Sequence, residues 1–278
     1  MAETVTRWHQ IRIKGPLAIF VLLTGLVGVT GCATPGGSTG SGFSQEVITP
    51  SDEPEVRRRA RIRLELAVNY FEMGKATVAL DEVKQSLVND PTYADAYNLR
   101  GLIYMRLNDM AQAEDSFRRA LSLRPSDPNV LHNHAWLLCQ QQKYAEADKQ
   151  FALVLANPTY VARSKTLMAQ GLCQARAGDN TVAEQTLLRA YELDAGNPMV
   201  GYTLADLLTR RGDLTRAQFY IRRINNSEFA NAESLWLGIK IERGLGDTVA
   251  VRQLAEQLRK RFPDSRELSA LERGAFND

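Results

Sequence analysis

The feature that most constrains this 278-residue chain is a segment that recurs about every 34 residues. A small residue, alanine or glycine, returns at successive intervals of 34, 34, 36, 34 and 33 residues. The six residues concerned are Ala67, Gly101, Ala135, Gly171, Ala205 and Gly238. A period of this length indicates a solenoid, because each unit is too short to bury its own apolar face and needs its neighbours to cover it.

Residues 94–127 show the pattern most clearly and read as two short amphipathic helices with a turn between them. Their marker residues are Tyr97, Gly101, Tyr104, Ala113, Phe117, Ala120 and Pro125. Small residues stand where two helices must approach closely, aromatic residues fill the space between units, and the proline cannot continue a helix. This spacing resembles the tetratricopeptide repeat (TPR).

We therefore predict an all-α fold for residues 57–278, a right-handed TPR superhelix of about six helix-turn-helix repeats and about twelve helices. The repeats are expected at about 60–93, 94–127, 128–161, 164–197, 198–231 and 231–265, followed by a C-terminal cap. Turn-forming residues stand where the first helix of five units must stop, namely Gly74, Asn108, Gly178, Gly212 and Gly246. The third unit has Gln142 there instead.

The N-terminus has the pattern of a bacterial secretory signal, which we assign to residues 1–31. An apolar run over residues 17–31 follows three basic residues and ends at Cys32. The alternative, an uncleaved membrane anchor, is disfavoured because the run falls short of the ~20 residues that a spanning helix needs. Residues 29–32, Val-Thr-Gly-Cys, resemble a lipobox, which implies lipidation of Cys32. The next residue is Ala33 and not aspartate, which favours the outer membrane over the inner membrane.

Residues 32–56 are rich in Gly, Ser, Thr and Pro and are predicted to form a flexible tether behind the lipidated cysteine. Removal of residues 1–31 would leave equal numbers of basic and acidic side chains, which argues against nucleic acid as a partner. One dense basic run lies at residues 55–61. It is either a solvated helix face or a contact with anionic lipid headgroups.

Nothing in the repeat region indicates an enzyme. His132 and His134 are two residues apart on a predicted helix, about 200° around its axis, so they cannot share a metal ion. The chain lacks a His-Glu-x-x-His run, a phosphate-binding glycine loop and a Gly-x-Ser-x-Gly elbow in this region. We therefore expect no catalytic residue, metal, cofactor or small-molecule substrate. His134 stands at a packing position, whereas His132 stands at a position that usually faces the groove.

Cys139 and Cys173 fall on first helices of the third and fourth units, which should be direct neighbours. In an oxidising compartment a disulfide between them is reasonable, and two buried thiols are the alternative. A Cα–Cα distance above about 7 Å would exclude the bridge.

The groove lined by first helices is the expected place of partner binding. Its predicted lining in the first three units is Leu64, Val68, Phe71, Asn98, Leu102, Met105, His132 and Trp136. An exposed apolar strip of this kind would take a peptide or a partner helix, although some of these residues could equally belong to the core. The Lys and Asn clamp of chaperone-binding repeats is not matched, because Leu64 and Val68 stand at two of its positions.

Several stretches go beyond a general repeat. These are residues 133–139 (NHAWLLC), 171–173 (GLC), 235–239 (LWLGI) with Glu242 and Arg243, and 262–265 (FPDS) with Glu267. Together with the lipobox and the paired cysteines they resemble the type IV pilus biogenesis and stability lipoproteins, the PilF/PilW-type pilotins, over residues 32 to about 267.

The resemblance implies an outer-membrane lipoprotein that faces the periplasm and binds the type IV pilus secretin, with its lipid on Cys32 in the outer membrane. It also implies that the early repeats contact the secretin, which here selects Leu64, Val68, Phe71, Leu102 and Met105. The alternative is a general periplasmic TPR lipoprotein that scaffolds peptidoglycan enzymes or outer-membrane assembly factors. A third possibility is an inner-membrane enzyme accessory held by an uncleaved helix.

Overall fold

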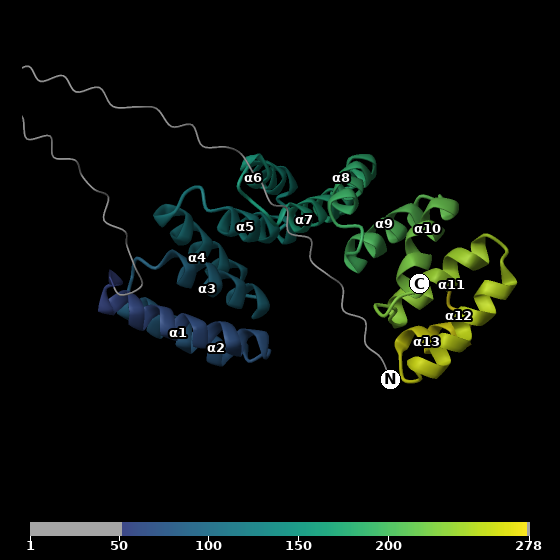
Figure 1. Ribbon diagram of the computed structural model, residues 1–278, viewed down its shortest axis with the longest axis horizontal. Helices are drawn as coiled ribbons and strands as arrows, with labels where there is room; N and C mark the ends of the chain where they lie inside the picture. The colour runs from purple at the N-terminus through teal and green to yellow at the C-terminus, as the bar shows by residue number, and fades with distance from the viewer. Residues whose placement is uncertain (1–51, 277–278) are drawn as a thin grey trace, which may run out of the picture. The chain divides into compact units, whose positions relative to one another are not determined.

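The computed structural model describes residues 52–276, so the expected signal sequence and Cys32 lie outside the described residues. This part of the chain holds thirteen α-helices and no strand (Figure 1). The helices are α1 (Glu55–Glu72), α2 (Ala76–Asn89), α3 (Ala94–Arg106), α4 (Met110–Leu123), α5 (Pro128–Gln140), α6 (Tyr144–Ala156), α7 (Arg163–Arg176), α8 (Asn180–Leu193), α9 (Pro198–Arg210), α10 (Leu214–Asn225), α11 (Ala232–Gly244), α12 (Thr248–Arg261) and α13 (Arg266–Arg273).

Helices α1 to α12 form six hairpins, and each hairpin has a tight turn at the end of its first helix. Each turn contains one residue with a positive φ angle: Gly74, Asn108, Gln142, Gly178, Gly212 or Gly246. Gln142 has φ +63°, so the unit that lacks a glycine or asparagine adopts the same left-handed backbone as the others. The repeat therefore imposes the turn even where the residue opposes it.

Side chains cap the first helices of the third, fifth and sixth hairpins. The Asp127 carboxylate accepts hydrogen bonds from the backbone N–H groups of Asn129 and Val130. Asn231 and Ser234 form a reciprocal capping box at the start of α11. Such caps satisfy N–H groups that have no partner within the helix, at about 1 kcal/mol each.

Close approach of the two helices in a hairpin depends on small residues. A Cβ atom added to Gly101 on α3 would lie 2.5 Å from Cε1 of Phe117 on α4. Ala113 and Ala120 flank that ring on α4, and all three α4 residues are fully buried. In the second hairpin the Phe117 ring thus packs directly against the backbone at Gly101.

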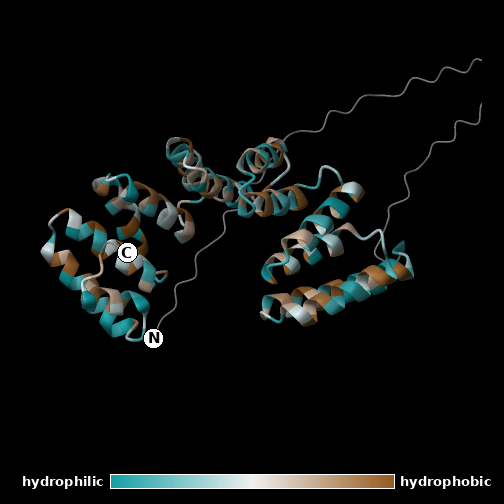
Figure 2. Ribbon diagram, turned by 180° about the vertical axis from the view of Figure 1, so that it is seen from behind, coloured by the Kyte–Doolittle hydropathy of each residue, from teal (hydrophilic) through white to brown (hydrophobic). Residues whose placement is uncertain are grey.

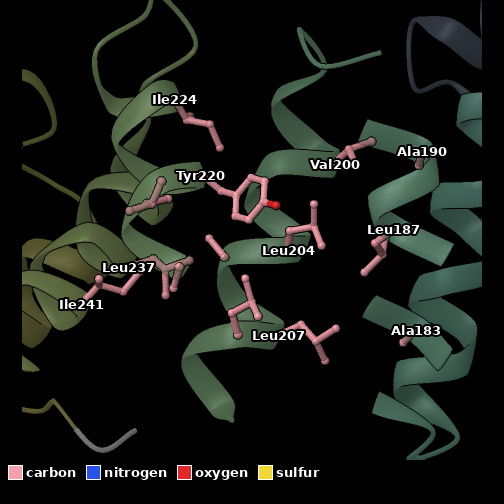
Figure 3. Packing of buried hydrophobic residues seen from close by; sticks show 14 of the residues in the cluster. Ala183, Leu187, Ala190, Val200, Leu204, Leu207, Tyr220, Ile224, Leu237 and Ile241 are labelled. Carbon is pink, nitrogen blue, oxygen red and sulfur yellow. The ribbon is translucent and has the colours of Figure 1, made fainter. Parts of the chain in front are cut away.

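Successive hairpins share their cores. Each first helix packs against the first helix of the next hairpin, and each second helix packs against the first helices on both sides of it. Figure 3 shows the largest cluster, to which Leu187 of α8, Leu204 of α9, Tyr220 of α10 and Ile241 of α11 belong. Apolar and polar residues alternate along the helices accordingly (Figure 2). The prediction of an all-α TPR superhelix is confirmed.

The last helix, α13, covers the end of the sixth hairpin. Ser265 caps its N-terminus by accepting from Leu268 N–H at 3.1 Å, and Leu268 is buried against the cluster of α11 and α12. Phe276 stacks near Trp236 with a ring-centroid distance of 5.1 Å. A short helix had been expected in this C-terminal segment as a cap, which a solenoid needs because its last repeat has no neighbour.

Candidate partner-binding face

The surface formed by the first helices α1, α3, α5, α7, α9 and α11 is called the first-helix face below. All eight predicted groove residues lie on α1, α3 or α5, but they differ in how much of each side chain is exposed. Leu64 and His132 are buried, at 9% and 7% exposure, so a partner could contact little of either side chain. Val68 is exposed at 36%. The remaining five are half-buried: Phe71, Asn98, Leu102, Met105 and Trp136.

Arginines cover two of the half-buried rings on this face. The Arg106 guanidinium carbon lies 5.3 Å from the centre of the Phe71 ring, and the Arg176 guanidinium carbon lies 5.0 Å from that of Trp136. Both distances suit a cation–π interaction. Arg106 also donates to the Phe71 backbone carbonyl at 3.2 Å, which links α3 to α1. The first three repeats therefore present apolar side chains interleaved with positive charge.

The Asn98 side chain forms a hydrogen bond between two repeats. Its Oδ1 accepts from Nδ2 of Asn133 at 3.0 Å, across the junction of α3 and α5. Leu102 and Met105 pack against the apolar cluster around Phe117 and Val130. These three residues contribute to the stack as well as to the face, because the first helices touch one another along it.

His132 belongs to a buried polar chain. Its Nδ1 lies 2.8 Å from Oγ1 of Thr166, which in turn lies 2.9 Å from the Tyr160 hydroxyl. Burial, aided by the positive charge of Lys165, lowers the pKa of His132 to about 4. The ring is therefore neutral at pH 7 and serves as a hydrogen-bonding core residue.

His134 lies in the core as well, on a different side of α5. It is buried, and its Nε2 lies 3.1 Å from Oε1 of Glu114 on α4. The two histidines thus have separate partners, His132 on α7 and His134 on α4. Among residues 52–276 no group of three or more His, Cys, Asp or Glu side chains could hold a metal ion.

Cys139 and Cys173 form a disulfide that joins α5 to α7. Their Cα atoms are 5.8 Å apart, inside the limit of about 7 Å. The bridge closes a sequence separation of 34 residues, for which loop-closure entropy suggests a stabilisation of about 3–4 kcal/mol. It lies beside Phe151 and Ala169 in the core, between the third and fourth repeats.

The basic run on α1 is neutralised by neighbouring carboxylates. All four arginines of residues 55–61 pair with an acidic residue: Arg57 with Asp90, Arg58 and Arg59 with Glu55, and Arg61 with Glu53 and Glu65. Arg63, just beyond the run, pairs with Glu82. This arrangement agrees with a solvated helix face better than with a lipid-binding patch, since each positive charge already has a partner.

The structure also places an apolar cleft where the sequence analysis named no residue. Met199 and Tyr202 on α9 line it together with Phe229, which lies in the connection between α10 and α11. Met199 and Phe229 are 56% and 50% exposed. Tyr202 stands three residues before Ala205, as Leu64 stands before Ala67 and Asn98 before Gly101, so the repeat spacing could have found it. Phe229 carries no such signal, because it lies in a connection.

None of the helices among residues 52–276 is both long and apolar enough to cross a membrane. The described part of the chain thus consists of stacked helical hairpins with an exposed, partly apolar face.

Comparison with known proteins agrees with this architecture. Family profiles described as "Tetratricopeptide repeat" match residues 94–127 and 132–198. The type IV pilus assembly protein PilF of Pseudomonas aeruginosa is 25% identical over 241 residues, which cover 87% of this chain and 92% of that protein.

Two solved structures of such proteins resemble the whole repeat region. The crystal structure of PilW, described as a widely conserved type IV pilus biogenesis factor, is 30% identical, covers 79% of this chain and 99% of its own, and superposes with a TM-score of 0.72. The structure of P. aeruginosa PilF superposes with a TM-score of 0.68 at 23% identity and covers 80% of this chain and 100% of its own. These relatives indicate a role in type IV pilus biogenesis, and the chain belongs to the family of TPR-containing type IV pilus biogenesis proteins that includes PilW and PilF.

Proposed function

We propose that the protein is a non-enzymatic outer-membrane lipoprotein, a pilotin, that binds the type IV pilus secretin and promotes its outer-membrane localisation, multimerisation and stability. The family membership supports a role in pilus biogenesis. The secretin as partner follows from the resemblance described above, and the first-helix face is the surface we assign to it.

The observation that carries the assignment is the row of apolar side chains on α1, α3 and α5. Val68 is exposed, and Phe71, Leu102, Met105 and Trp136 are half-buried, so an incoming apolar segment could complete their burial. Arg106 and Arg176 lie over two of these rings. A secretin segment with apolar residues and a nearby carboxylate would match this surface in both shape and charge.

The lipid would determine where the bound secretin subunit is held. An acylated Cys32 would hold the bound secretin subunit at the bilayer, and residues 33–54 would act as the linker between anchor and repeats. With 22 residues such a linker has a root-mean-square reach of roughly 25 Å, which raises the local concentration of the face near the membrane.

Two variants test the anchor and the face separately. Cys32→Ser removes the lipid acceptor, and Val68→Glu places a charge on the exposed apolar row without breaking α1. Each should lower the amount of heat-resistant secretin multimer in the outer membrane. Leu153→Glu on α6 is a matched control, because Leu153 is 60% exposed but lies on a second helix.

Normal multimer levels with Cys32→Ser would overturn the pilotin assignment. Normal levels with Val68→Glu, or an equal loss with Leu153→Glu, would overturn the assignment of the face. A mass measurement of the purified protein that showed an N-terminus other than an acylated Cys32 would overturn the lipoprotein assignment.

A further inference from the structure

A second candidate binding site lies around the fifth repeat, at its junctions with the fourth and sixth repeats and far along the chain from the row proposed for the secretin. Two cavities open on either side of Phe229, with volumes of about 210 and 240 Å³. Both are lined by Pro198, Ile224 and Phe229. One continues to Tyr191 and Tyr220, and the other to Met199 and Tyr202. The two cavities with Phe229 between them are called the Phe229 cleft below.

The cleft arises from an irregularity in the repeat. Six residues separate α10 from α11, as they separate α6 from α7, whereas four separate α2 from α3, α4 from α5 and α8 from α9. The longer connection places Phe229 half in solvent beside the start of α9. On the core side, Ile224 and Tyr220 close the cleft from α10 (Figure 3).

The size of each cavity indicates what it could hold. Small-molecule sites usually measure about 300–1,000 Å³, and each compartment is smaller than that. A single bulky side chain fits such a volume, and the lining is aromatic and aliphatic. Exposed Met199 and Phe229 would gain burial from an apolar anchor residue of an extended segment.

Glu233 places a negative charge in the lining of the Met199 compartment. Tyr202 has its pKa raised by burial and, beyond that, by the carboxylates of Asp206, Glu233 and Glu267. These acids come from α9, α11 and α13. Among the described groups that affect the pKa of Tyr202, the one cation is Arg210. Its guanidinium is already paired with the Asp206 carboxylate at 2.8 Å.

The positive side chains further along α11 are occupied elsewhere. Lys240 lies over the Trp236 ring, and Arg243 lies 3.8 Å from the centre of the Phe276 ring. On the other side of Phe229, the Tyr220 compartment is lined by Arg223. The cleft is therefore acidic at the Met199 side and basic at the Arg223 side, in contrast with the arginine-covered rings of the first three repeats.

We propose that the Phe229 cleft docks an extended segment of a partner protein in which a bulky apolar anchor residue is followed or preceded by a lysine or arginine. The anchor enters beside Phe229 and Met199, and the positive side chain lies against Glu233 and Glu267. Charge complementarity decides at which end of the cleft the cation lies, because the same cation would be repelled at Arg223. The site is separate from the Val68 row, so the protein could hold two segments at once.

The test uses the purified full chain as bait for a library of random linear peptides displayed on phage. Selected sequences should combine an aromatic or large aliphatic residue with Lys or Arg. Synthetic copies of these peptides are then titrated by fluorescence polarisation. Phe229→Ser, Met199→Ser and Glu233→Lys should each weaken binding by about tenfold or more. Raising the salt concentration should weaken it further.

Matched controls distinguish this site from others. Arg223→Glu, which adds negative charge on the opposite side, should leave binding unchanged or strengthen it. Leu153→Ser and Val68→Ser remove exposed apolar residues elsewhere and should have no effect. The proposal is overturned if no peptide depends on Phe229, if the selected peptides are acidic, or if Val68→Ser abolishes binding as well.

Sedimentation of the full chain tests whether a second copy of the chain occupies the cleft instead. If the chain self-associates and Phe229→Ser abolishes that association, the cleft is an interface between two copies and the proposal is wrong. Secretin multimers in the Phe229→Ser strain report on the pilotin function independently, so failure of one proposal does not imply failure of the other.

Discussion

Gly101 on α3 faces the ring of Phe117 on α4 so closely that a Cβ atom there would lie 2.5–2.8 Å from three ring carbons. Three of the equivalent positions in the other repeats hold alanine instead, Ala67, Ala135 and Ala205. At Gly101 the fully buried ring of Phe117 approaches the backbone so closely that a methyl group has no room.

We expect Gly101→Ala to destabilise the protein by about 1–2 kcal/mol, although alanine is the better helix former. The reason is that overpacking costs about 1–3 kcal/mol, whereas the gain in helix propensity is about 1 kcal/mol. Chemical denaturation measures the change. In a Phe117→Leu background the same substitution should be neutral or stabilising, and an equal penalty in both backgrounds would contradict the ring contact.

Gln142→Gly should stabilise the third hairpin by about 0.5–1 kcal/mol. Gln142 has φ +63°, a conformation that costs a residue with a Cβ atom about 1–2 kcal/mol. Glycine removes this strain, but its greater conformational entropy in the unfolded chain cancels part of the gain. Asn108→Gly, at φ +61°, is the control and should gain less because asparagine tolerates this region. Thermal unfolding of both variants would show the difference, and a larger gain for Asn108→Gly would rule out the explanation.

The carboxylate of Glu242 on α11 is 1% exposed and depends on α10 for its partners. Arg222 donates to both of its oxygens, at 2.7 and 3.0 Å, and Gln218 donates to one at 2.7 Å. Arg222→Met should therefore cost about 2–3 kcal/mol, because it leaves a buried charge without its counter-ion.

Arg58→Met is the control for that change, since Arg58 pairs with Glu55 at the surface and both side chains are about half exposed. Its cost should stay below about 0.5 kcal/mol. Adding Glu242→Gln to Arg222→Met should recover part of the lost stability. If the double variant were no more stable than Arg222→Met alone, burial of the charge would not be the cause.

Stability should fall between pH 6.5 and pH 4 partly because of His132. Burial lowers the pKa of its ring to about 4, below the value of 6.5 expected in the unfolded chain. The unfolded state therefore binds the proton first, and the stability contributed by the neutral ring is present above pH 6.5 and is lost as the pH falls toward 4.

The size of this effect is roughly 3 kcal/mol, from about 1.4 kcal/mol per pKa unit. Urea denaturation of the wild type and of His132→Gln at pH 7 and at pH 4.5 would measure it. The wild type should lose more stability than the variant over this interval. Equal losses would mean that His132 titrates alike in the folded and unfolded states.

Much of the architecture was predictable because the repeat is encoded locally. Ala113 and Phe117 fall where a helical hairpin needs a small and a large residue. From the second repeat onward, each expected repeat begins within a few residues of the observed first helix of its hairpin. The burial of two predicted groove residues was not predictable. Leu64 and His132 share a groove position with Asn98, yet they are buried, because neighbouring helices cover them.

By itself, the sequence determined the number of hairpins, their turns and the positions of Cys139 and Cys173 on adjacent first helices. These properties repeat with a fixed period and depend on residues that are near one another in the chain. Only the tertiary structure decided that all the arginines of the basic run are paired, that His132 is neutral, and that a cleft opens beside Phe229. Arg57 meets Asp90 because α2 packs against α1, and the other two features join side chains from different repeats. Their approach is set by packing and not by the spacing of any one motif.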